Sequence, residues 1–504
     1  MSHLFYQPKG HWFGDCMPYA EDGTFYLFHQ RDTRRPGPFG EPFGWALATT
    51  TDFVDYEDHG EVIERGDDDA QDQFVFAGSV FKAADTYYAL YTGFNRDYPA
   101  LGKASQVLMI ATSTDLLTWT KTAKTLVVPQ PGYDPDDWRD PFVLWDDAIG
   151  AYRMILGARR LEGARVLTGR TVSFTSTDLD EWTFDGDFWA PGLYSMHEMP
   201  DLFRIGDHWY LLTTEYSDKS KTVYAMSRSI SGPWLTPADD AFDGRAYYAA
   251  RSAADGDRRY LFGWVPTKQE DDEKAAWEWG GTLVVHEVFP REDGTLAVRA
   301  PQTVLDVFAP AKSVPPRRLE PVDAAAESVL VEQSGDLFRF DATVRFTAST
   351  RWFSLRLWED ESSGDGYEYR FDLATGLLTF DRRPNYPWYR YDNKGLDRPI
   401  GLAPDTDHHI TLLVDDTIAT LYVDGVALSA RGYTRPGRGI AMQALGGTLE
   451  VLDATIAHPR TVEVDHDAAQ RHARARPGRS PERHRHDQLL GTSSTPREPF
   501  PTLP

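Results

Sequence analysis

Short runs in which apolar and polar residues alternate follow one another along the first 300 residues, for example at residues 24–29, 87–91 and 152–156. Many of the apolar positions are aromatic or β-branched, and the alternation with a period of two is typical of β-strands that bury one face. Sustained periods of 3.6 residues, which indicate amphipathic helices, are missing. The pattern therefore predicts an all-β chain.

A turn motif of the form Ser/Thr-x-Asp-apolar-x-x-aromatic recurs between these strands, at residues 50–56, 113–119 and 176–182. A degenerate copy occupies residues 229–234, and a fifth unit without the turn fits residues 246–286. Repeated units that each contain several short strands are typical of the blades of a β-propeller, whose sheets surround a central channel. We therefore predict a five-bladed β-propeller.

The sequence pattern changes after about residue 300, where a proline-containing connector leads into a second β-rich region. Residues 337–344, 352–358 and 410–415 alternate as strands, and Asp424-Gly425 is a hairpin signal. Strands at this spacing without helices predict a C-terminal β-sandwich. The predicted organisation is a propeller over residues 1–300, a linker over 301–328, a sandwich over 329–458, and a disordered Arg/His-rich tail over 459–504.

Charge and cysteine content narrow the possible partners and compartments. A formal net charge of -25 opposes binding to nucleic acid or to an anionic membrane surface, which carry the same sign. Cys16 is the single cysteine, so an intrachain disulfide is excluded, and the N-terminus shows neither an export signal nor an apolar run of ~18 residues. We expect a cytoplasmic protein with a small carbohydrate as its partner, while the sequence indicates no oligomeric state.

Three acidic residues, Asp15, Asp140 and Glu198, each precede the first strand of a predicted blade. First strands line the channel of a propeller, so three blades are expected to direct a carboxylate into one cavity. Glycoside cleavage needs a proton donor on one side of the sugar and a carboxylate on the other. Close carboxylates raise one another's pKa, as an acid catalyst at neutral pH requires. This chemistry calls for no cofactor, and the acidic run at residues 67–69 is interpreted as a solvated loop without a metal.

Several motifs point to a known family. Residues 139–142 read Arg-Asp-Pro-Phe and residues 198–203 read Glu-Met-Pro-Asp-Leu-Phe, while residues 76–79 read Phe-Ala-Gly-Ser and residues 279–281 read Trp-Gly-Gly. With these motifs the chain, over about residues 5–458, resembles glycoside hydrolase family 32, the invertase, levanase and inulinase group. Met199 stands in place of the cysteine in the family's Glu-Cys-Pro motif.

The resemblance implies a five-bladed propeller joined to a sandwich, and it implies a role for each acid. Asp15 would be the nucleophile, Asp140 would stabilise the transition state by holding sugar hydroxyls, and Glu198 would be the general acid/base. Arg139 would keep Asp140 ionised and reach a substrate oxygen. Candidate substrate-binding residues, including aromatic side chains able to stack on a sugar, are Arg139, Trp279, Phe76, Ser79 and Trp45.

The chain departs from the family in the first motif, where residues 14–18 read Gly-Asp-Cys-Met-Pro in place of Asn-Asp-Pro-Asn-Gly. The acid remains, but the two asparagines that position the sugar and the nucleophile are absent. We therefore expect a divergent, exo-acting, retaining β-fructofuranosidase. The alternatives are an inverting arabinofuranosidase or xylosidase in which Asp15 activates water, a fructosyltransferase, and a non-catalytic carbohydrate-binding propeller.

Overall fold

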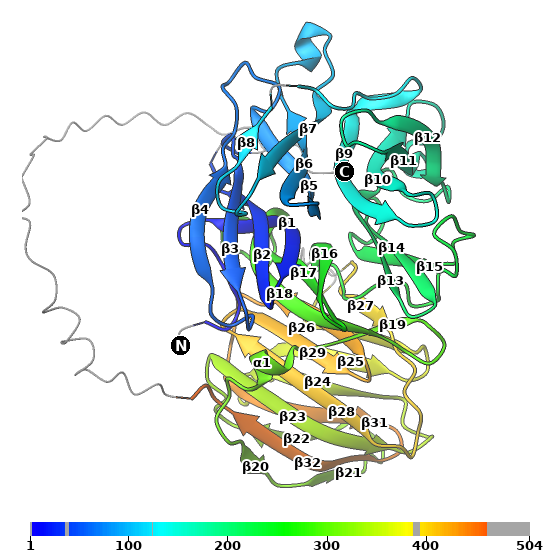
Figure 1. Ribbon diagram of the computed structural model, residues 1–504. Helices are drawn as coiled ribbons and strands as arrows, with labels where there is room; N and C mark the ends of the chain where they lie inside the picture. The colour runs from blue at the N-terminus through cyan, green and yellow to red at the C-terminus, as the bar shows by residue number, and fades with distance from the viewer. Residues whose placement is uncertain (1–2, 36–39, 123, 387–393, 461–504) are drawn as a thin grey trace, which may run out of the picture.

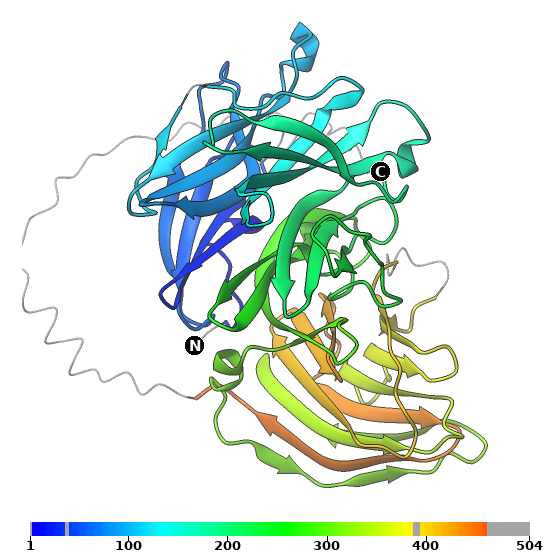
Figure 2. The same ribbon diagram turned by 45° about the vertical axis from the view of Figure 1, so that its right-hand side comes forward.

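The computed structural model describes residues 3–35, 40–122, 124–386 and 394–460, and within them it confirms the predicted all-β fold (Figure 1). A five-bladed β-propeller is followed by a β-sandwich, which packs against one side of the propeller (Figure 2). The helices of the described part are single turns: α1 (Gln302–Leu305), η1 (Pro99–Leu101), η2 (Arg165–Leu167) and η3 (Gln269–Asp271).

Each blade is an antiparallel sheet whose strands follow the chain order. The first blade contains β1 (Trp12–Glu21), β2 (Thr24–Asp32), β3 (Trp45–Thr50) and β4 (Glu57–Ile63), and the second contains β5 (Phe74–Ala83), β6 (Thr86–Phe94), β7 (Gln106–Ser113) and β8 (Thr120–Lys121). The third contains β9 (Tyr133–Asp146), β10 (Ala151–Arg160), β11 (Gly169–Ser176) and β12 (Thr183–Trp189). The fourth contains β13 (Glu198–Ile205), β14 (His208–Thr214) and β15 (Thr222–Ser227), and the fifth contains β16 (Tyr248–Asp255), β17 (Arg258–Lys268), β18 (Trp277–Pro290) and β19 (Leu296–Arg299).

The ring of blades is closed by a pairing between its two ends. Strand β1 pairs with β18 through Phe13 and Gly281, so the first and fifth blades form one continuous sheet. Gly281 also pairs with β17, where a Cβ would lie 1.8 Å from the carbonyl oxygen of Val265, so glycine is required at this position. Closure leaves β1, β5, β9, β13 and β16 around the middle of the propeller, where the labels of Figure 1 place them.

The repeated turn motif has one hydrogen-bonding scheme. In the first copy the Thr50 hydroxyl accepts a bond from the N–H of Phe53 (2.9 Å), and the Asp52 carboxylate accepts bonds from the next two N–H groups (2.9 Å each). Phe53 is buried and has a φ of 64°. The copies at residues 113–119 and 176–182 form the same bonds, so the repeat is a turn that ends the third strand of a blade.

The fourth copy of this turn starts earlier than the sequence pattern predicts. Strand β15 ends at Ser227, whose hydroxyl accepts a hydrogen bond from the N–H of Ser229 at 3.1 Å. Ser227 therefore stands where Thr50 stands in the first blade, two residues before the predicted start at Ser229.

The sandwich consists of two antiparallel sheets. One contains β20 (Lys312–Val314) and β21 (Arg317–Leu319) on β32 (Leu449–Ala457), then β23 (Leu337–Phe346), β28 (His408–Asp415), β29 (Ile418–Val423) and β30 (Val426–Arg431). The other contains β22 (Ala326–Val331), β31 (Gly439–Leu445), β24 (Trp352–Glu359), β25 (Gly366–Asp372), β26 (Leu377–Arg383) and β27 (Asp397–Pro399).

The propeller and the sandwich share buried residues at their junction. Tyr247 of the fifth blade belongs to the same apolar cluster as the sandwich core. The Arg431 guanidinium donates hydrogen bonds to the carbonyls of Val265 (3.1 Å) and Pro266 (2.9 Å). The junction between the propeller and the sandwich is therefore part of the core of the protein.

The domain boundaries at residues 300, 328 and 458 remain predictions. Strands β20 and β21 lie in the stretch predicted as a linker and pair with β32 of the sandwich. The predicted tail, residues 459–504, lies outside the described residues except for Pro459 and Arg460.

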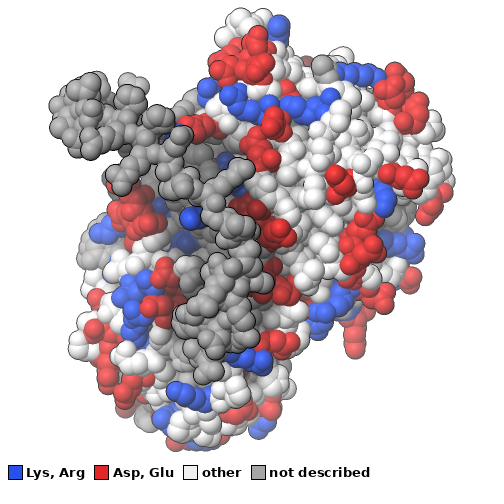
Figure 3. Space-filling view, turned by 60° about the vertical axis from the view of Figure 1, so that its left-hand side comes forward, with Lys and Arg blue, Asp and Glu red and all other residues white. Residues whose placement is uncertain are grey.

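The surface carries the excess of acid found in the sequence. Figure 3 shows Asp and Glu side chains over both domains, with Lys and Arg among them. Across the described residues, the helices are too short and too polar to cross a membrane.

Candidate active site

A local irregularity in the first strand of each blade shapes the middle of the propeller. The antiparallel register shifts close to the start of β1, β5, β13 and β16, and in β9 it shifts both near the start and again between Arg139 and Phe142. Such bulges bend a strand and redirect its side chains. Asp15 lies in the shift of β1, Asp140 has a φ of 64°, and Met199, which follows Glu198, has a φ of 50°. The three predicted acids therefore occupy redirected positions of three blades.

Glu198 receives hydrogen bonds from two neighbouring blades. Arg139 Nη2 donates to Oε1 at 2.8 Å, and the Tyr248 hydroxyl donates to Oε2 at 2.6 Å. The Glu198 side chain keeps 19% of its surface exposed, so solvent reaches the side chain. Both carboxyl oxygens are thus oriented by donors of different character, a cation and a neutral hydroxyl.

Asp15 is held from the fifth blade. Trp264 Nε1 on β17 donates a hydrogen bond to Asp15 Oδ1 at 3.1 Å. Burial raises the pKa of Asp15 well above its ordinary value, and the negative charges of Asp140 and Glu198 raise it further. Asp140 and Glu198 are therefore both within electrostatic reach of Asp15.

Asp140 is fixed by backbone contacts from other blades. Its Oδ2 accepts a hydrogen bond from the N–H of Met199 at 3.0 Å, and its own N–H donates to the Thr92 hydroxyl at 3.0 Å. Beneath it, the buried guanidinium of Arg251 donates to the carbonyl of Asp140 at 2.7 Å and to the carbonyl of Gly78. Arg251 thereby joins the fifth, third and second blades.

The environment of Glu198 favours its protonated form. Burial raises the pKa of Glu198, the positive charge of Arg139 lowers it, and the charge of Asp140 raises it, with a net upward shift. An acid that keeps its proton to higher pH suits general acid catalysis. Because Asp15 and Glu198 interact, the pH dependence of any activity belongs to the group of acids as a whole.

Arg139 is part of a chain of ion pairs that leads away from the acids. Its Nη1 donates to Asp137 Oδ1 at 2.6 Å, and Arg159 binds both Asp137 (2.5 Å) and Asp134 (2.6 Å). The charges of Arg139 and Glu198 also act on the hydroxyl of Tyr216, whose pKa is raised chiefly by burial. This network holds the guanidinium of Arg139 in one orientation.

Aromatic side chains lie beside Asp15. The Trp279 indole covers Gly14 so closely that a Cβ at Gly14 would lie 2.3 Å from the ring. The same indole is nearly parallel to the ring of Phe43 (6.3 Å, 8°), and Phe43 is stacked on Phe76 (6.1 Å, 21°). Trp279 and Phe76 are both partly exposed, and Trp279 adjoins the first motif at Gly14.

The structure places two other candidates inside the protein. Trp45 is fully buried and donates its indole N–H to the carbonyl of Phe76 at 3.1 Å, so both ring faces pack in the core. The buried Ser79 hydroxyl accepts a hydrogen bond from the N–H of Val143 at 3.2 Å and links β5 to β9. In this conformation these residues support the site from behind.

Sequence reasoning missed three residues that touch or support the acids, namely Tyr248, Trp264 and Arg251. Tyr248 had a usable signal, because it starts the first strand of the fifth blade, as Glu198 starts that of the fourth. Trp264 and Arg251 lie within strands whose local pattern is that of any buried strand. Only long-range contacts distinguish them.

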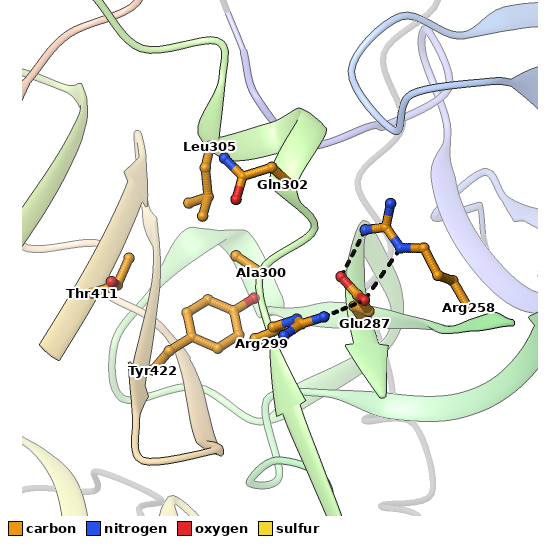
Figure 4. Close-up of a pocket in the computed structure, with 8 residues that line it drawn as sticks. All are labelled: Arg258, Glu287, Arg299, Ala300, Gln302, Leu305, Thr411 and Tyr422. Carbon is orange, nitrogen blue, oxygen red and sulfur yellow. Dashed lines mark hydrogen bonds and ion pairs between the residues drawn. The ribbon is translucent and has the colours of Figure 1, made fainter. Parts of the chain in front are cut away.

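A cavity of about 290 Å³ lies elsewhere, between the fifth blade and the sandwich (Figure 4). In it, Arg258 and Arg299 bind the carboxylate of Glu287 at 2.9 and 2.7 Å. Thr411 and Tyr422 line the sandwich side. The cavity contains none of the candidate catalytic residues, so the chemistry of the acids is not located there.

Comparisons with known proteins agree with this architecture. Residues 5–297 match the Glycosyl hydrolases family 32 N-terminal domain. The chain is 25% identical over 410 residues to a levanase of Bacillus subtilis (strain 168), an alignment that covers 72% of this chain and 56% of the levanase. It is 23% identical over 475 residues to a sucrose-6-phosphate hydrolase of Escherichia coli, covering 86% of this chain and 89% of that protein.

Solved structures share the fold. Fructan 1-exohydrolase IIa from Cichorium intybus superimposes with a TM-score of 0.72 at 16% identity, over 90% of this chain and 96% of that chain. A sucrose-6-phosphate hydrolase from Lactobacillus gasseri gives a TM-score of 0.71 at 18% identity, over 92% and 93% of the two chains. The resemblance predicted from the sequence motifs is confirmed by the family match.

Proposed function

The chain belongs to glycosyl hydrolase family 32, and on that premise we propose that it is a retaining, exo-acting β-fructofuranosidase that releases terminal fructose from small fructosides or fructan ends. The named relatives include a levanase and a sucrose-6-phosphate hydrolase, so fructosides are the substrate class to test first. The observation that carries the proposal is the convergence of Asp15, Asp140 and Glu198 from three blades.

The proposed reaction has two displacement steps. Asp15 attacks the anomeric carbon while Glu198 gives its proton to the departing glycosidic oxygen, and the covalent fructosyl intermediate is then released by water that Glu198 deprotonates. Asp140 binds sugar hydroxyls and stabilises the positive charge that develops on the ring. The two donors on Glu198 support this role, because they keep its carboxyl group oriented through both steps.

The experiment compares Asp15→Asn and Glu198→Gln with the wild type on sucrose, levan and an aryl β-fructofuranoside. We expect Asp15→Asn to lower kcat/KM by at least about 1,000-fold on every substrate. Glu198→Gln should lose roughly 100- to 10,000-fold on sucrose and much less on the aryl substrate, whose leaving group needs no proton. The exposed Glu162 provides a matched control, since Glu162→Gln should retain full activity.

Two outcomes would contradict the proposal. A well-folded wild type without turnover of any fructoside would favour the carbohydrate-binding alternative. Inverted stereochemistry of the first product, followed by NMR, would favour the alternative in which Asp15 activates water.

A further inference from the structure

The first motif of this chain lacks the amide side chains that accompany the acid in the family it resembles. Gly14 and Met17 stand at those two positions, and neither side chain can donate a hydrogen bond to Asp15. A buried carboxylate that has to attack a carbon atom still requires a fixed orientation. Another group must therefore orient Asp15.

Trp264 meets this need. Among the described residues, the hydrogen bond to the Asp15 carboxylate comes from its Nε1, 3.1 Å from Oδ1. The bond leaves Oδ2 as the oxygen free to attack. Asp15 and Trp264 lie on β1 and β17, which belong to the first and fifth blades, so the contact depends on closure of the ring.

The indole of Trp264 has little freedom to move. It is 2% exposed, its ring lies 5.1 Å from that of Tyr248, and it meets the ring of Trp279 edge-on at 5.9 Å. Tyr248 in turn donates a hydrogen bond to Glu198. The Trp264 indole therefore contacts the hydrogen-bond partner of Glu198 while it donates to the carboxylate of Asp15.

The same aromatic cluster explains why position 14 carries no amide. A Cβ at Gly14 would lie 2.3 Å from the Trp279 ring, so an asparagine would not fit without displacing that indole. The space next to Asp15 is thus filled by indole rings, one of which supplies the donor.

We propose that Trp264 is the positioning residue of the nucleophile in this protein, and that its indole N–H replaces the amide donors absent from the first motif. The inference rests on the proposed function, because it assigns Asp15 the attacking role. In the first step Asp15 Oδ2 bonds to the anomeric carbon, the glycosidic C–O bond breaks, and the proton of Glu198 passes to the leaving oxygen. Trp264 keeps its proton throughout.

The test is Trp264→Phe, which keeps an aromatic ring and removes the donor. We expect kcat on sucrose to fall roughly 10- to 100-fold while KM changes less than about threefold. Besides Trp264, the charged groups that act on Asp15 are Asp140, Glu198 and Arg251. The charge of Asp15 acts in turn on Tyr248 and Cys16, and none of these residues is changed by the substitution.

The direction of the change in the pH profile separates loss of the donor from loss of packing, because better hydration of Asp15 would lower its pKa whereas loss of the hydrogen bond raises it. The hydrogen bond from Trp264 lowers the pKa of Asp15, so its removal raises that pKa, and the acidic limb of kcat/KM should move to higher pH. Trp264→His, a smaller ring that keeps an N–H donor, should retain more activity than Trp264→Phe. Trp119→Phe, which removes an indole donor to the Leu116 carbonyl elsewhere in the propeller, should leave the profile unchanged.

The outcomes separate this inference from the proposed function. If Asp15→Asn abolishes turnover but Trp264→Phe keeps both kcat and the acidic limb, the positioning role of Trp264 is overturned and the function stands. If Trp264→His is no more active than Trp264→Phe, the positioning role is overturned as well, because the activity would then depend on the volume of the ring and not on the N–H donor. If Asp15→Asn remains active, the proposed function fails first.

Discussion

At the scale of single residues, the chemistry of the site depends on which donors meet each carboxyl group. Glu198 has one charged donor, Arg139, and one neutral donor, Tyr248. The Tyr248 hydroxyl can be removed without leaving a buried charge unpaired, so a substitution at Tyr248 tests the role of a hydrogen bond to Glu198 more directly than one at Arg139.

Tyr248→Phe is expected to extend activity to higher pH. The Tyr248 hydrogen bond lowers the pKa of Glu198, so its loss raises that pKa, and Glu198 acts as an acid only while protonated. The basic limb of kcat/KM should therefore move upward, with a drop of about tenfold at the optimum. The neighbouring Tyr247, whose hydroxyl donates to the Leu261 carbonyl, is the control, and Tyr247→Phe should not move the limb. A limb that stays in place or moves downward in Tyr248→Phe would refute the assignment.

At the scale of elements, the bulge in β1 and the start of β18 fit together through Gly14 and Trp279. A side chain at position 14 would overlap the indole, while the indole is also restrained by Phe43 and Trp264. Packing, and not backbone conformation, is therefore what requires glycine at position 14, since its φ lies outside the left-handed region.

Gly14→Ala should lower the free energy of unfolding by about 1–3 kcal/mol, the usual cost of overpacking. The penalty should largely disappear when Trp279→Leu is present, so thermal unfolding of both single variants and the double variant forms a cycle. Gly401→Ala, at a glycine with open space around its Cβ position, should change stability little. Additive effects in the cycle would show that Trp279 is not what excludes a side chain from position 14.

At the scale of the whole molecule, the propeller and the sandwich are joined by a buried polar network around Asp243. Its carboxylate accepts hydrogen bonds from the N–H (2.6 Å) and hydroxyl (2.7 Å) of Ser429, and it lies 3.0 Å from His286 Nε2. His286 Nδ1 lies 2.9 Å from the Tyr422 hydroxyl. Removing one member of a buried network leaves the others without partners, which is costly.

Asp243→Ala should therefore lower Tm by several degrees, with a loss of about 3 kcal/mol or more. Activity of the folded enzyme at 25 °C should change less than about twofold, because the network lies outside the group of acids. Calorimetry with kcat/KM on sucrose checks both points, and Asp257→Ala on the exposed surface is the control. An unchanged Tm would show that this network does not hold the two domains together.

Much of this architecture was predictable because the signals are local. Alternation of apolar and polar residues along a strand indicates which face is buried. The turns that start at Thr50, Ser113 and Ser176 form their hydrogen bonds between residues a few positions apart, so a short segment of sequence is enough to predict each turn. The motifs around Asp140 and Glu198 likewise identified the family, which the match to residues 5–297 confirms.

The sequence by itself thus determined the class of fold and the family, and it singled out three acids as the catalytic candidates, since each of these signals depends on neighbours in the chain. The tertiary structure decided which donors meet those acids, because Trp264 is 249 residues from Asp15 and Tyr248 is 50 residues from Glu198. It also decided that Trp45 and Ser79 pack inside, whereas the sequence made both of them candidates for substrate binding. Closure of the ring and the register shift in each first strand create these contacts, and neither leaves a periodic trace in the sequence.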